Sequence, residues 1–417
     1  MKNVWIMNHY ATEMYINEGG RHYWFAKYLS KSGYSPLIIS ASTLHTVDAQ
    51  ITKTRNRIVN RSDKEVPFVF VKSSSYKGNG LSRLKNMISF YVNLMLSYKE
   101  IMKIYGKPDI IYASSVHPLT IVAGIKIANR LNVPVVSEIR DLWPEAIFAF
   151  DRAKEKSILG RLLVLGEKWM YKKSNSIIFL KEGDHQYLVE RGWTIEQGGP
   201  IDLQRVHYIN NGIDLHQYFS QIESTELYDE DLKSELFKVI YVGAIRPVNN
   251  LEKIVDAAIA LRNEDRIKFL IYGDGSERER LESIITSEGL NNIVFKGQVK
   301  KEMIPYILSK SSLNILNYSQ TKYNWERGSS SNKLFEYMAS GKPILSTVKM
   351  GYSIIEKYNC GIELSNPSGV DIAKAIIAMF EQPKAQLESF GINGQLGARD
   401  FDFKSLTIKL AKVFEGL

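Results

Sequence analysis

The stretch GSSSNKLFEYMASGKPIL, residues 328–345, leads from a serine-rich loop into a short amphipathic helix and then, through Gly-Lys-Pro, into an apolar strand. Ser331 or Asn332 is suited to cap the helix, because its side-chain oxygen can accept a hydrogen bond from a free backbone amide. Helices that alternate with short apolar strands cover the faces of a parallel sheet. The stretch therefore predicts an α/β fold.

The same alternation runs through the chain in two series of strands. The first series contains KNVWIM (2–7), PLIIS (36–40), FVFV (68–71), DIIYAS (109–114), VPVVSEI (133–139) and SIIFL (176–180). The second contains KVIYVG (238–243), IKFLIYG (267–273), NIVFKG (292–297), LNILNY (313–318) and KPILST (342–347). Two series in 417 residues indicate two domains, because one ordinary core does not accommodate so long a chain.

We therefore predict two Rossmann-like, doubly wound parallel-sheet domains that face a central cleft. The N-terminal domain is expected over 1–205 and the C-terminal domain over 206–397. Residues 398–417 carry apolar side chains at 406, 410 and 413. This spacing predicts a C-terminal helix. We expect this helix to pack back on the N-terminal domain.

Composition narrows the class of protein. The single cysteine, Cys360, excludes an internal disulfide framework and a cysteine-rich zinc site, and it suits a cytoplasmic protein. The apolar run near the N-terminus is too short for the core of a signal peptide. The longest apolar stretches fall well short of the roughly 20 residues that span a bilayer. We expect no membrane-spanning segment.

The positive charge lies in the N-terminal half. Residues 1–200 carry a net charge of +11, whereas residues 201–417 carry −2. Nucleic-acid binding would explain such a basic half, but no recognised motif supports it. A solvated surface is the second explanation, and contact with an anionic membrane is the third. ISFYVNLML (88–96) and SILGRLLVLGEKWMYKK (157–173) place apolar side chains beside that charge.

The start of the quoted helix favours an anion. Its free amides and dipole attract negative charge, and Lys333 adds a full positive charge beside them. A diphosphate would fit these groups. The alternative is a surface ion pair between Lys333 and Glu336, worth only about 0.2–0.5 kcal/mol. These residues alone leave the two interpretations equally open.

Several segments resemble the family 4 glycosyltransferases, which have the GT-B fold of two Rossmann-like domains. The quoted stretch resembles the E-x7-E signature of that family, and EIRDLWPE (138–145) is similar to a segment of bacterial capsule and O-antigen aminosugar transferases of the N-acetylfucosamine type. Similar matches extend over nearly the whole chain: INEGGRHYWFAKYLSKSGYSP, IIFLKEGDHQYLVERG, YINNGIDLHQY, YVGAIRPVNNLEKIVDAA and LIYGDGSERERL.

The resemblance implies a retaining glycosyltransferase. Its donor would be a UDP-sugar, with GDP as the open alternative, and its sugar an N-acetylated deoxyaminosugar. The acceptor would be a saccharide, linked to a lipid diphosphate, in bacterial surface polysaccharide (capsule or O-antigen) biosynthesis. The enzyme would need no metal and no cofactor, would bind no nucleic acid, and would be cytoplasmic and peripheral on the inner face of the plasma membrane.

The resemblance also assigns roles to residues. Lys333 would face the donor diphosphate and Glu336 the ribose hydroxyls, and both join Arg246 as catalytic candidates. The expected donor-binding residues are Gly19, Gly20, Arg246, Gly273, Val299, Ser331, Asn332, Lys333, Leu334 and Glu336. Two departures bear on this site. Gly328 stands where the motif has its first glutamate, which Glu326 is placed to replace, and Ala244 and Asn250 stand where the family has an Arg and a Lys.

The candidates for the acceptor or sugar are His9, His117, Arg140, Asp141 and Glu326. Each has a structural alternative: the histidines can be ordinary buried residues and Asp141 a helix cap. Gly19-Gly20 can likewise be an ordinary tight turn. Asp229-Glu230-Asp231 has the spacing of a metal-binding D-x-D motif, but its position in an acidic linker favours a solvated charge run.

Three functions are alternatives to a glycosyltransferase. A dehydrogenase is disfavoured, because Arg278 stands where a dinucleotide fingerprint would have its third glycine. A nucleotide-sugar epimerase can share the two-domain architecture. A catalytically weak nucleotide-sugar-binding subunit is the last alternative, because Gly328 replaces a motif glutamate.

Overall fold

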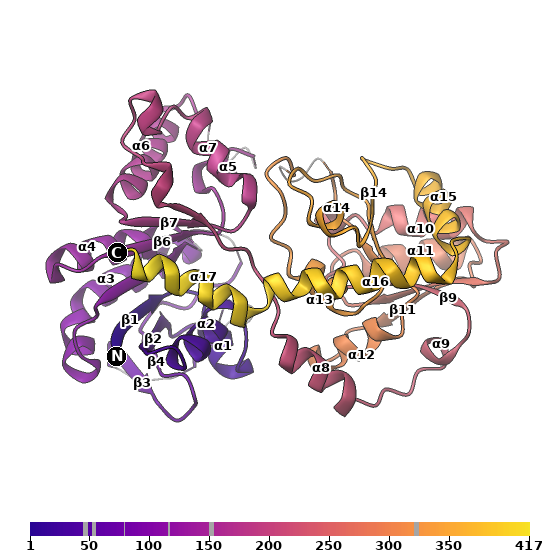
Figure 1. The fold of residues 1–417 in the computed structure, drawn as a ribbon, viewed down its shortest axis with the longest axis horizontal. Coiled ribbons are helices and arrows are strands. Elements are labelled where there is room, and N and C mark those ends of the chain that lie inside the picture. Colours follow the sequence, from indigo (N-terminus) through magenta and orange to yellow (C-terminus); the bar gives the residue numbers. More distant parts are fainter. Residues whose placement is uncertain (45–48, 52–55, 79, 116, 150–153, 321–324) are drawn as a thin grey trace. The chain divides into compact units, whose positions relative to one another are not determined.

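The computed structural model describes all residues except 45–48, 52–55, 79, 116, 150–153 and 321–324. The chain divides into two compact units (Figure 1). The first consists of Met1–Asn210 and Phe403–Leu417, and the second of Asn211–Asp402. Each unit is a helix-covered sheet with its own cores.

Within the described residues, the first unit has an eight-stranded sheet in the order β3-β4-β2-β1-β5-β6-β7-β8. Its strands are β1 (Lys2–Met7), β2 (Tyr34–Ala41), β3 (Ile58–Arg61), β4 (Phe68–Val71), β5 (Ile110–Ser115), β6 (Val135–Ile139), β7 (Ser176–Phe179) and β8 (Val206–Tyr208). The pairs are parallel except β3 with β4. The central strands are almost wholly buried, as expected for a sheet covered on both faces.

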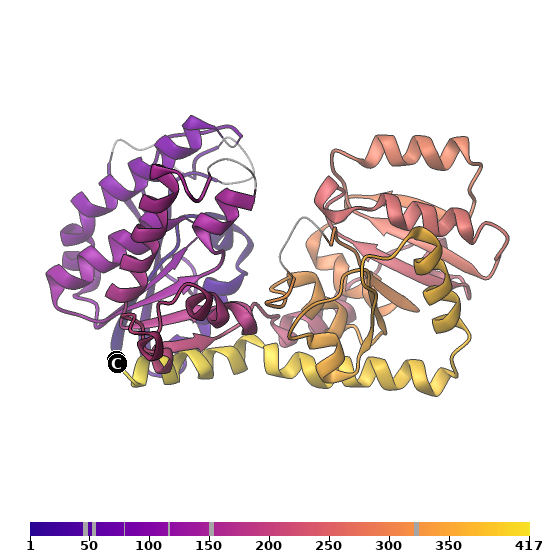
Figure 2. The ribbon, with the colours of Figure 1, turned by 90° about the horizontal axis from the view of Figure 1, so that it is seen from above.

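Helices cover both faces of this sheet (Figures 1 and 2). They are α1 (Thr12–Asn17), α2 (Arg21–Ser30), α3 (Leu81–Tyr105), α4 (Pro118–Leu131), α5 (Trp143–Ala149), α6 (Ile158–Lys173), α7 (His185–Glu190) and α17 (Phe403–Glu415). Phe90 of α3, Ile121 of α4 and Met170 of α6 share one core. Phe25 of α2 and Leu410 of α17 belong to the core on the other face.

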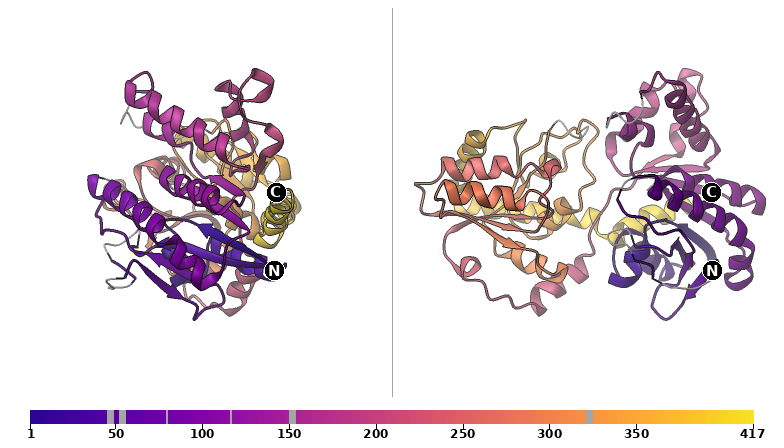
Figure 3. Two further views of the ribbon diagram at one scale, coloured as in Figure 1. Left: turned by 90° about the vertical axis from the view of Figure 1, so that its left-hand side faces the viewer. Right: turned by 180° about the vertical axis from the view of Figure 1, so that it is seen from behind.

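Within the described part of the second unit, a six-stranded sheet has the order β11-β10-β9-β12-β13-β14 (Figure 3). Its parallel strands are β9 (Phe237–Val242), β10 (Ile267–Tyr272), β11 (Ile293–Gly297), β12 (Leu313–Leu316), β13 (Ile344–Ser346) and β14 (Gly361–Glu363). Its helices are α8 (Leu215–Ser224), α9 (Glu230–Lys233), α10 (Glu252–Ala260), α11 (Arg278–Ser287), α12 (Ile304–Ser309), α13 (Asn332–Ala339), α14 (Ile354–Tyr358), α15 (Gly369–Phe380) and α16 (Lys384–Ala398).

In each sheet the strand order reverses beside the first strand. β1 lies between β2 and β5, and β9 lies between β10 and β12. In an open α/β sheet the ligand crevice forms at such a point, outside the carboxyl ends of the strands. His9 follows β1, His117 follows β5, Gly243 follows β9 and Tyr318 follows β12. The topology therefore places the candidates His9 and His117 at the switch point of the first sheet, and the loop that carries the candidate Arg246 at the switch point of the second.

The unit boundaries differ slightly from the predicted ones. Residues 206–210 belong to the first unit rather than the second, because β8 pairs with β7. Residues 398–402 belong to the second unit, because α16 continues to Ala398. The terminal helix α17 begins at Phe403, contacts α2 and buries Leu406, Leu410 and Val413 against the first unit (Figure 1).

Candidate functional site

The serine-rich loop enters α13 as predicted, but its capping differs from the prediction. Ser331 occupies the N-cap position, yet its side chain accepts no hydrogen bond from the helix amides. Its Oγ instead lies 2.7 Å from the hydroxyl of Tyr318, which follows β12. Asn332 is the first helical residue and is exposed. The amides at this end are therefore not capped by the N-cap side chain, and such amides can bind an anion.

Lys333 extends from the first turn of α13 to the switch point of the second sheet. Its Nζ donates a hydrogen bond of 2.7 Å to the hydroxyl of Tyr241 on β9. The same ammonium lies 4.4 Å from the ring centre of Tyr241 and 4.9 Å from that of Tyr318. Burial lowers the pKa of Lys333 to about 7, although Glu336 opposes the shift. A bound anion would favour the charged form of this lysine.

Gly243 makes room for this lysine, and Gly273 in turn makes room for the backbone of Gly243. A Cβ at Gly243 would lie 2.4 Å from Cε and 2.6 Å from Nζ of Lys333. A Cβ at Gly273 would lie 1.9 Å from the carbonyl oxygen of Gly243. The amide of Gly243 donates to the carbonyl of Tyr272, and that of Gly273 donates to the carbonyl of Gly297. The loops after β9, β10 and β11 thus form one tightly packed rim, and Gly273 is part of it.

Glu336 lies one turn after Lys333 and is half-buried. Burial raises the pKa of Glu336, while the charges of Lys301 and Lys333 work in the opposite direction. Its own carbonyl accepts a hydrogen bond of 3.1 Å from Tyr218. Leu334, in the same turn, is fully buried in the core. Val299 is partly buried against that core, in the segment between β11 and the η5 turn (Lys301–Met303).

The remaining donor-side candidates lie on loops. Arg246 is exposed and precedes the η4 turn (Pro247–Asn249), which follows β9. Asn317, at the end of β12, donates to the carbonyls of Asn249 and Asn250, so the loops after β9 and β12 are joined. Gly328 adopts a φ of +98°. Glu326 is exposed and lines a hollow of about 590 Å³ with Lys349.

In the first unit, the two predicted histidines contact each other. Their ring centres lie 4.7 Å apart, and both side chains are fully buried. Nε2 of His9 lies 2.7 Å from Oδ1 of Asn86 on α3. Within the described part of the chain, neither ring nitrogen of His117 has a hydrogen-bond partner. Burial, with a contribution from Arg83, lowers the pKa of His117 to about 3, so the ring is neutral.

A buried charge network adjoins these histidines, and sequence reasoning missed it. Glu138 on β6 accepts hydrogen bonds from Nε of Arg21 at 2.7 Å and from Ser114 at 2.7 Å, and also from the hydroxyl of Tyr112. Nε2 of His22 lies 3.1 Å from the same carboxylate. Burial acts to raise the pKa of Glu138, but the charges of Arg21 and His22 hold it well below its usual range.

Arg21 also holds the backbone that follows β8, where the first segment of the first unit ends. Its guanidinium donates to the backbone carbonyls of Ile209 and Asn210. It follows the predicted Gly19-Gly20 turn, in which Gly20 adopts a φ of +100° and precedes α2. The signal available in the sequence was the charged pair itself, since Glu138 opens EIRDLWPE and Arg21 follows the glycines.

Arg140 and Asp141 follow β6 at the same edge of the sheet. The backbone amide of Arg140 donates to Ser115 Oγ at 3.1 Å, and its side chain is half-buried. Asp141 is exposed. Helix α5 begins at Trp143, two positions further on.

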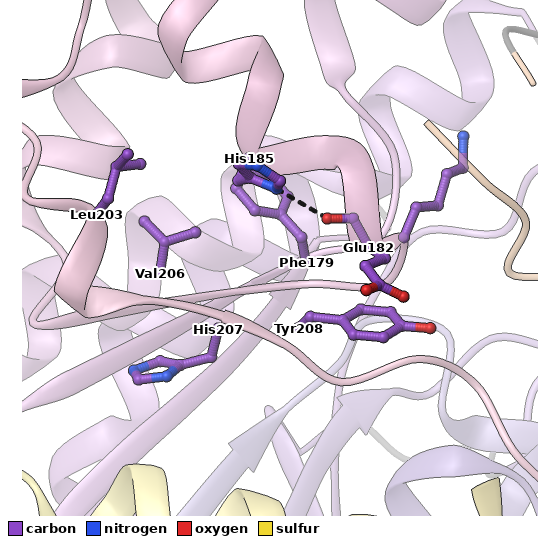
Figure 4. Close-up of a pocket in the computed structure, with 8 residues that line it drawn as sticks. Phe179, Glu182, His185, Leu203, Val206, His207 and Tyr208 are labelled. Atoms are coloured by element: carbon purple, nitrogen blue, oxygen red, sulfur yellow. Dashed lines mark hydrogen bonds between the residues drawn. The ribbon is translucent and has the colours of Figure 1, made fainter. Parts of the chain in front are cut away.

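A hollow of about 230 Å³ lies further along the sheet, at the ends of β7 and β8 (Figure 4). Figure 4 shows the ring of Tyr208 beside the side chain of Glu182, whose carbonyl lies 2.8 Å from Nδ1 of His185. The hollow is lined by Phe179, Lys181, Glu182, His185, Leu203, Val206, His207 and Tyr208. β6 separates these strands from β5 in the sheet order, so this hollow is not at the switch point.

The acidic linker is not a solvated charge run, which corrects the prediction. Asp229 pairs with Lys296 at 2.8 Å and accepts a hydrogen bond from Tyr272. Asp231 pairs with Lys268 and with Lys296, both at 2.6 Å. The spacing that resembles a metal motif therefore ties α9 to the edge of the second sheet.

Comparisons with known proteins find similarity to glycosyltransferases. Residues 225–396 match the family model described as glycosyl transferases group 1. The chain is 24% identical over 255 residues to an uncharacterized glycosyltransferase of Methanocaldococcus jannaschii, with 60% of each chain covered. It is 26% identical over 179 residues to the alpha-D-kanosaminyltransferase of Streptomyces kanamyceticus, with 42% of this chain and 45% of the other covered. The chain thus spans less than two thirds of the length of these curated relatives.

In structure, the chain resembles HepE of Anabaena, solved in complex with UDP, with a TM-score of 0.67 and 16% identity. The comparison covers 100% of both chains. HepE was also solved with UDP and glucose and with UDP-glucose. At this identity, the likeness shows that the two parallel-sheet units share the fold of that protein.

Proposed function

We propose that the protein is a glycosyltransferase that uses a UDP-sugar as donor, because residues 225–396 match the glycosyl transferases group 1 family model and the chain shares the two-unit fold of HepE. The observation that carries the proposal is the position of Lys333. Its ammonium lies at the switch point of the second sheet, beside the N-terminus of α13 and above Gly243.

The donor diphosphate would bind between Lys333 and the amides of α13. Cations and helix amides at this place stabilise negative charge as it develops on the departing diphosphate. The sugar keeps its anomeric configuration, because the acceptor hydroxyl attacks from the face that the diphosphate leaves and the diphosphate accepts its proton. Arg246, exposed on the loop after β9, would add charge to the same group.

Other residues would orient the donor. Glu336 would accept hydrogen bonds from the ribose hydroxyls, and Gly273 and Val299 would border the base. Glu326 would contact the sugar in place of the motif glutamate that Gly328 replaces. His9, His117 and Arg140, at the edge of the first sheet, would serve the acceptor or the sugar.

Three observations support the identity of the substrates. HepE, with the same fold, was solved with UDP and UDP-glucose. One relative is named a kanosaminyltransferase, which agrees with an aminosugar donor. The resemblance of EIRDLWPE to capsule and O-antigen aminosugar transferases favours a lipid-linked saccharide acceptor in surface polysaccharide assembly.

The alternatives predict different products. An epimerase would convert the donor sugar without an acceptor, and the match to glycosyl transferases group 1 disfavours it. A binding subunit would bind UDP and leave every UDP-sugar intact. Analysis of the products formed from UDP-sugars, with and without a saccharide acceptor, separates these cases.

The first experiment is calorimetric titration of the full chain with UDP, GDP and NAD. Lys333→Ala and Glu336→Ala are each expected to weaken UDP binding at least about tenfold, because a charged hydrogen bond contributes about 1.5–3 kcal/mol. Lys342→Ala, a half-buried lysine beyond the other end of α13, serves as the control and should bind UDP normally. Binding of NAD without UDP or GDP would overturn the proposal.

A further inference from the structure

Helix α6 turns a row of apolar side chains outwards, where a surface helix normally carries polar residues. Ile158, Leu162, Leu165 and Trp169 recur at intervals of four, three and four residues, which places them on one side of the helix. Their exposed fractions are 82%, 60%, 61% and 37%. Met170 lies in the core on the other side. A helix on a soluble surface normally turns its apolar stripe towards the core and polar residues outwards.

Basic residues border this face. Arg161, Lys172 and Lys173 are exposed on α6, and Lys154 and Lys156 are exposed just before it. The neighbouring acidic side chains are engaged elsewhere. Glu155 pairs with Arg191, and Glu167 is buried, with hydrogen bonds of 2.7 and 2.6 Å from two tyrosines.

Helix α3 has a second stripe of the same kind. Leu84, Ile88, Val92 and Leu96 follow one another at four-residue spacing and are 49%, 46%, 43% and 58% exposed. Lys85 and Lys99 are exposed beside them. Helix α4 contacts both α3 and α6, and all three helices contribute to the core on one face of the first sheet.

Both helices begin at the edge of the sheet that carries the acceptor candidates. A crossover helix in a parallel sheet starts at the carboxyl end of the preceding strand. Asn86, in the second turn of α3, accordingly contacts His9 after β1. The most exposed apolar side chains of the two helices, Leu81 and Ile158, are at these starting ends, with exposed fractions of 85% and 82%.

We propose that the outward faces of α3 and α6 form an interaction surface for an anionic lipid bilayer. The surface rests on the proposed function, since it would bring the acceptor edge of the first unit to a lipid-linked substrate. Leucine and isoleucine side chains enter the interfacial region, tryptophan favours that region, and the lysines and arginines attract anionic headgroups. Among the described helices, none is long and apolar enough to cross the bilayer, so the contact is interfacial.

Charge argues for lipid rather than a second copy of the chain. A symmetric dimer through α6 would bring the same basic border of both copies together, and like charges in an interface disfavour association. An anionic bilayer is complementary to the apolar face and to the border at once.

The test is co-sedimentation of the full chain with vesicles of phosphatidylcholine alone and of phosphatidylcholine with phosphatidylglycerol in equal parts. Strong binding is expected for the anionic vesicles, and it should weaken as salt is added. Leu162→Glu combined with Leu165→Glu should reduce this binding by about a hundredfold, because two leucines leave the apolar region. Lys172→Glu combined with Lys173→Glu should reduce it on anionic vesicles by about tenfold or more.

The control pair is Ile392→Glu with Leu396→Glu on α16, where the side chains are 58% and 51% exposed. These two residues are also apolar, exposed and four positions apart, so the pair should keep the vesicle binding. Equal loss in the control pair, equal binding to both kinds of vesicle, or a dimer that the α6 variants dissociate would each overturn the proposal. UDP titration of the same variants keeps the two proposals apart, because a failed membrane surface leaves UDP binding intact and a failed donor site leaves vesicle binding intact.

Discussion

Gly243→Ala tests whether the donor phosphates bind at the position that the Lys333 ammonium occupies beside Gly243. The added Cβ would lie 2.4 Å from Cε of Lys333, so the lysine must leave its position above Tyr241. The end of the Lys333 side chain is flexible, so α13 can stay in place. Loss of one charged contact of about 1.5–3 kcal/mol predicts a loss of UDP affinity of roughly tenfold to a hundredfold. The left-handed φ of +149° adds a strain of about 1–3 kcal/mol to the folded state.

The assay is UDP calorimetry with urea unfolding of the same samples. Gly289→Ala is the matched control: its φ is +62°, and a Cβ there would meet no atom of the described residues within 4 Å. It likewise adds a Cβ at a positive φ, and it should keep UDP affinity. Gly243→Ala combined with Lys333→Ala should weaken binding no more than Lys333→Ala alone, because both remove one interaction. Additive losses, or normal UDP affinity in Gly243→Ala, would refute the reasoning.

Two further predictions concern pH and stability. The pKa of Lys333 is about 7, and a diphosphate favours its charged form, so UDP affinity should fall as pH rises from about 7 to about 9. Lys333→Ala should remove this pH dependence. Calorimetry across that range measures it, and an affinity that does not change with pH in the unmodified protein would contradict the prediction. Arg21→Met should destabilise the first unit by about 3–5 kcal/mol, because it leaves Glu138 buried without its main partner. Arg262→Met removes an exposed ion pair with Glu288 and should lower the free energy of unfolding by less than about 1 kcal/mol. Urea unfolding measures both variants, and equal losses would show that burial of the ion pair does not matter.

Much of the fold follows from local sequence patterns. Fully buried strands such as 68–71 form continuous apolar runs, and the structure has β4 there. The helix predicted after the serine-rich loop of the 328–345 stretch is α13. β3 escaped prediction because it is four residues long with two exposed positions.

The candidate site could be predicted only in part, because local sequence does not specify tertiary neighbours. The serine-rich entry to α13 and Lys333 were identifiable from residue type and position. The rings of Tyr241 and Tyr318 were not, since they come from two other strands that only the sheet order brings beside the lysine. The same holds for Glu138, whose partners lie on α2 and β5.

The position of α17 has a consequence for the order in which the chain can fold during synthesis. This helix covers a face of the first unit with Phe403, Leu406 and Leu410, yet it is translated only after the whole second unit. Until then, the apolar side chains that it covers on α2 and the first sheet are uncovered, although the remainder of that unit was made long before. The second unit, by contrast, is complete as soon as residue 402 emerges. The half that begins folding first is therefore the half that finishes last.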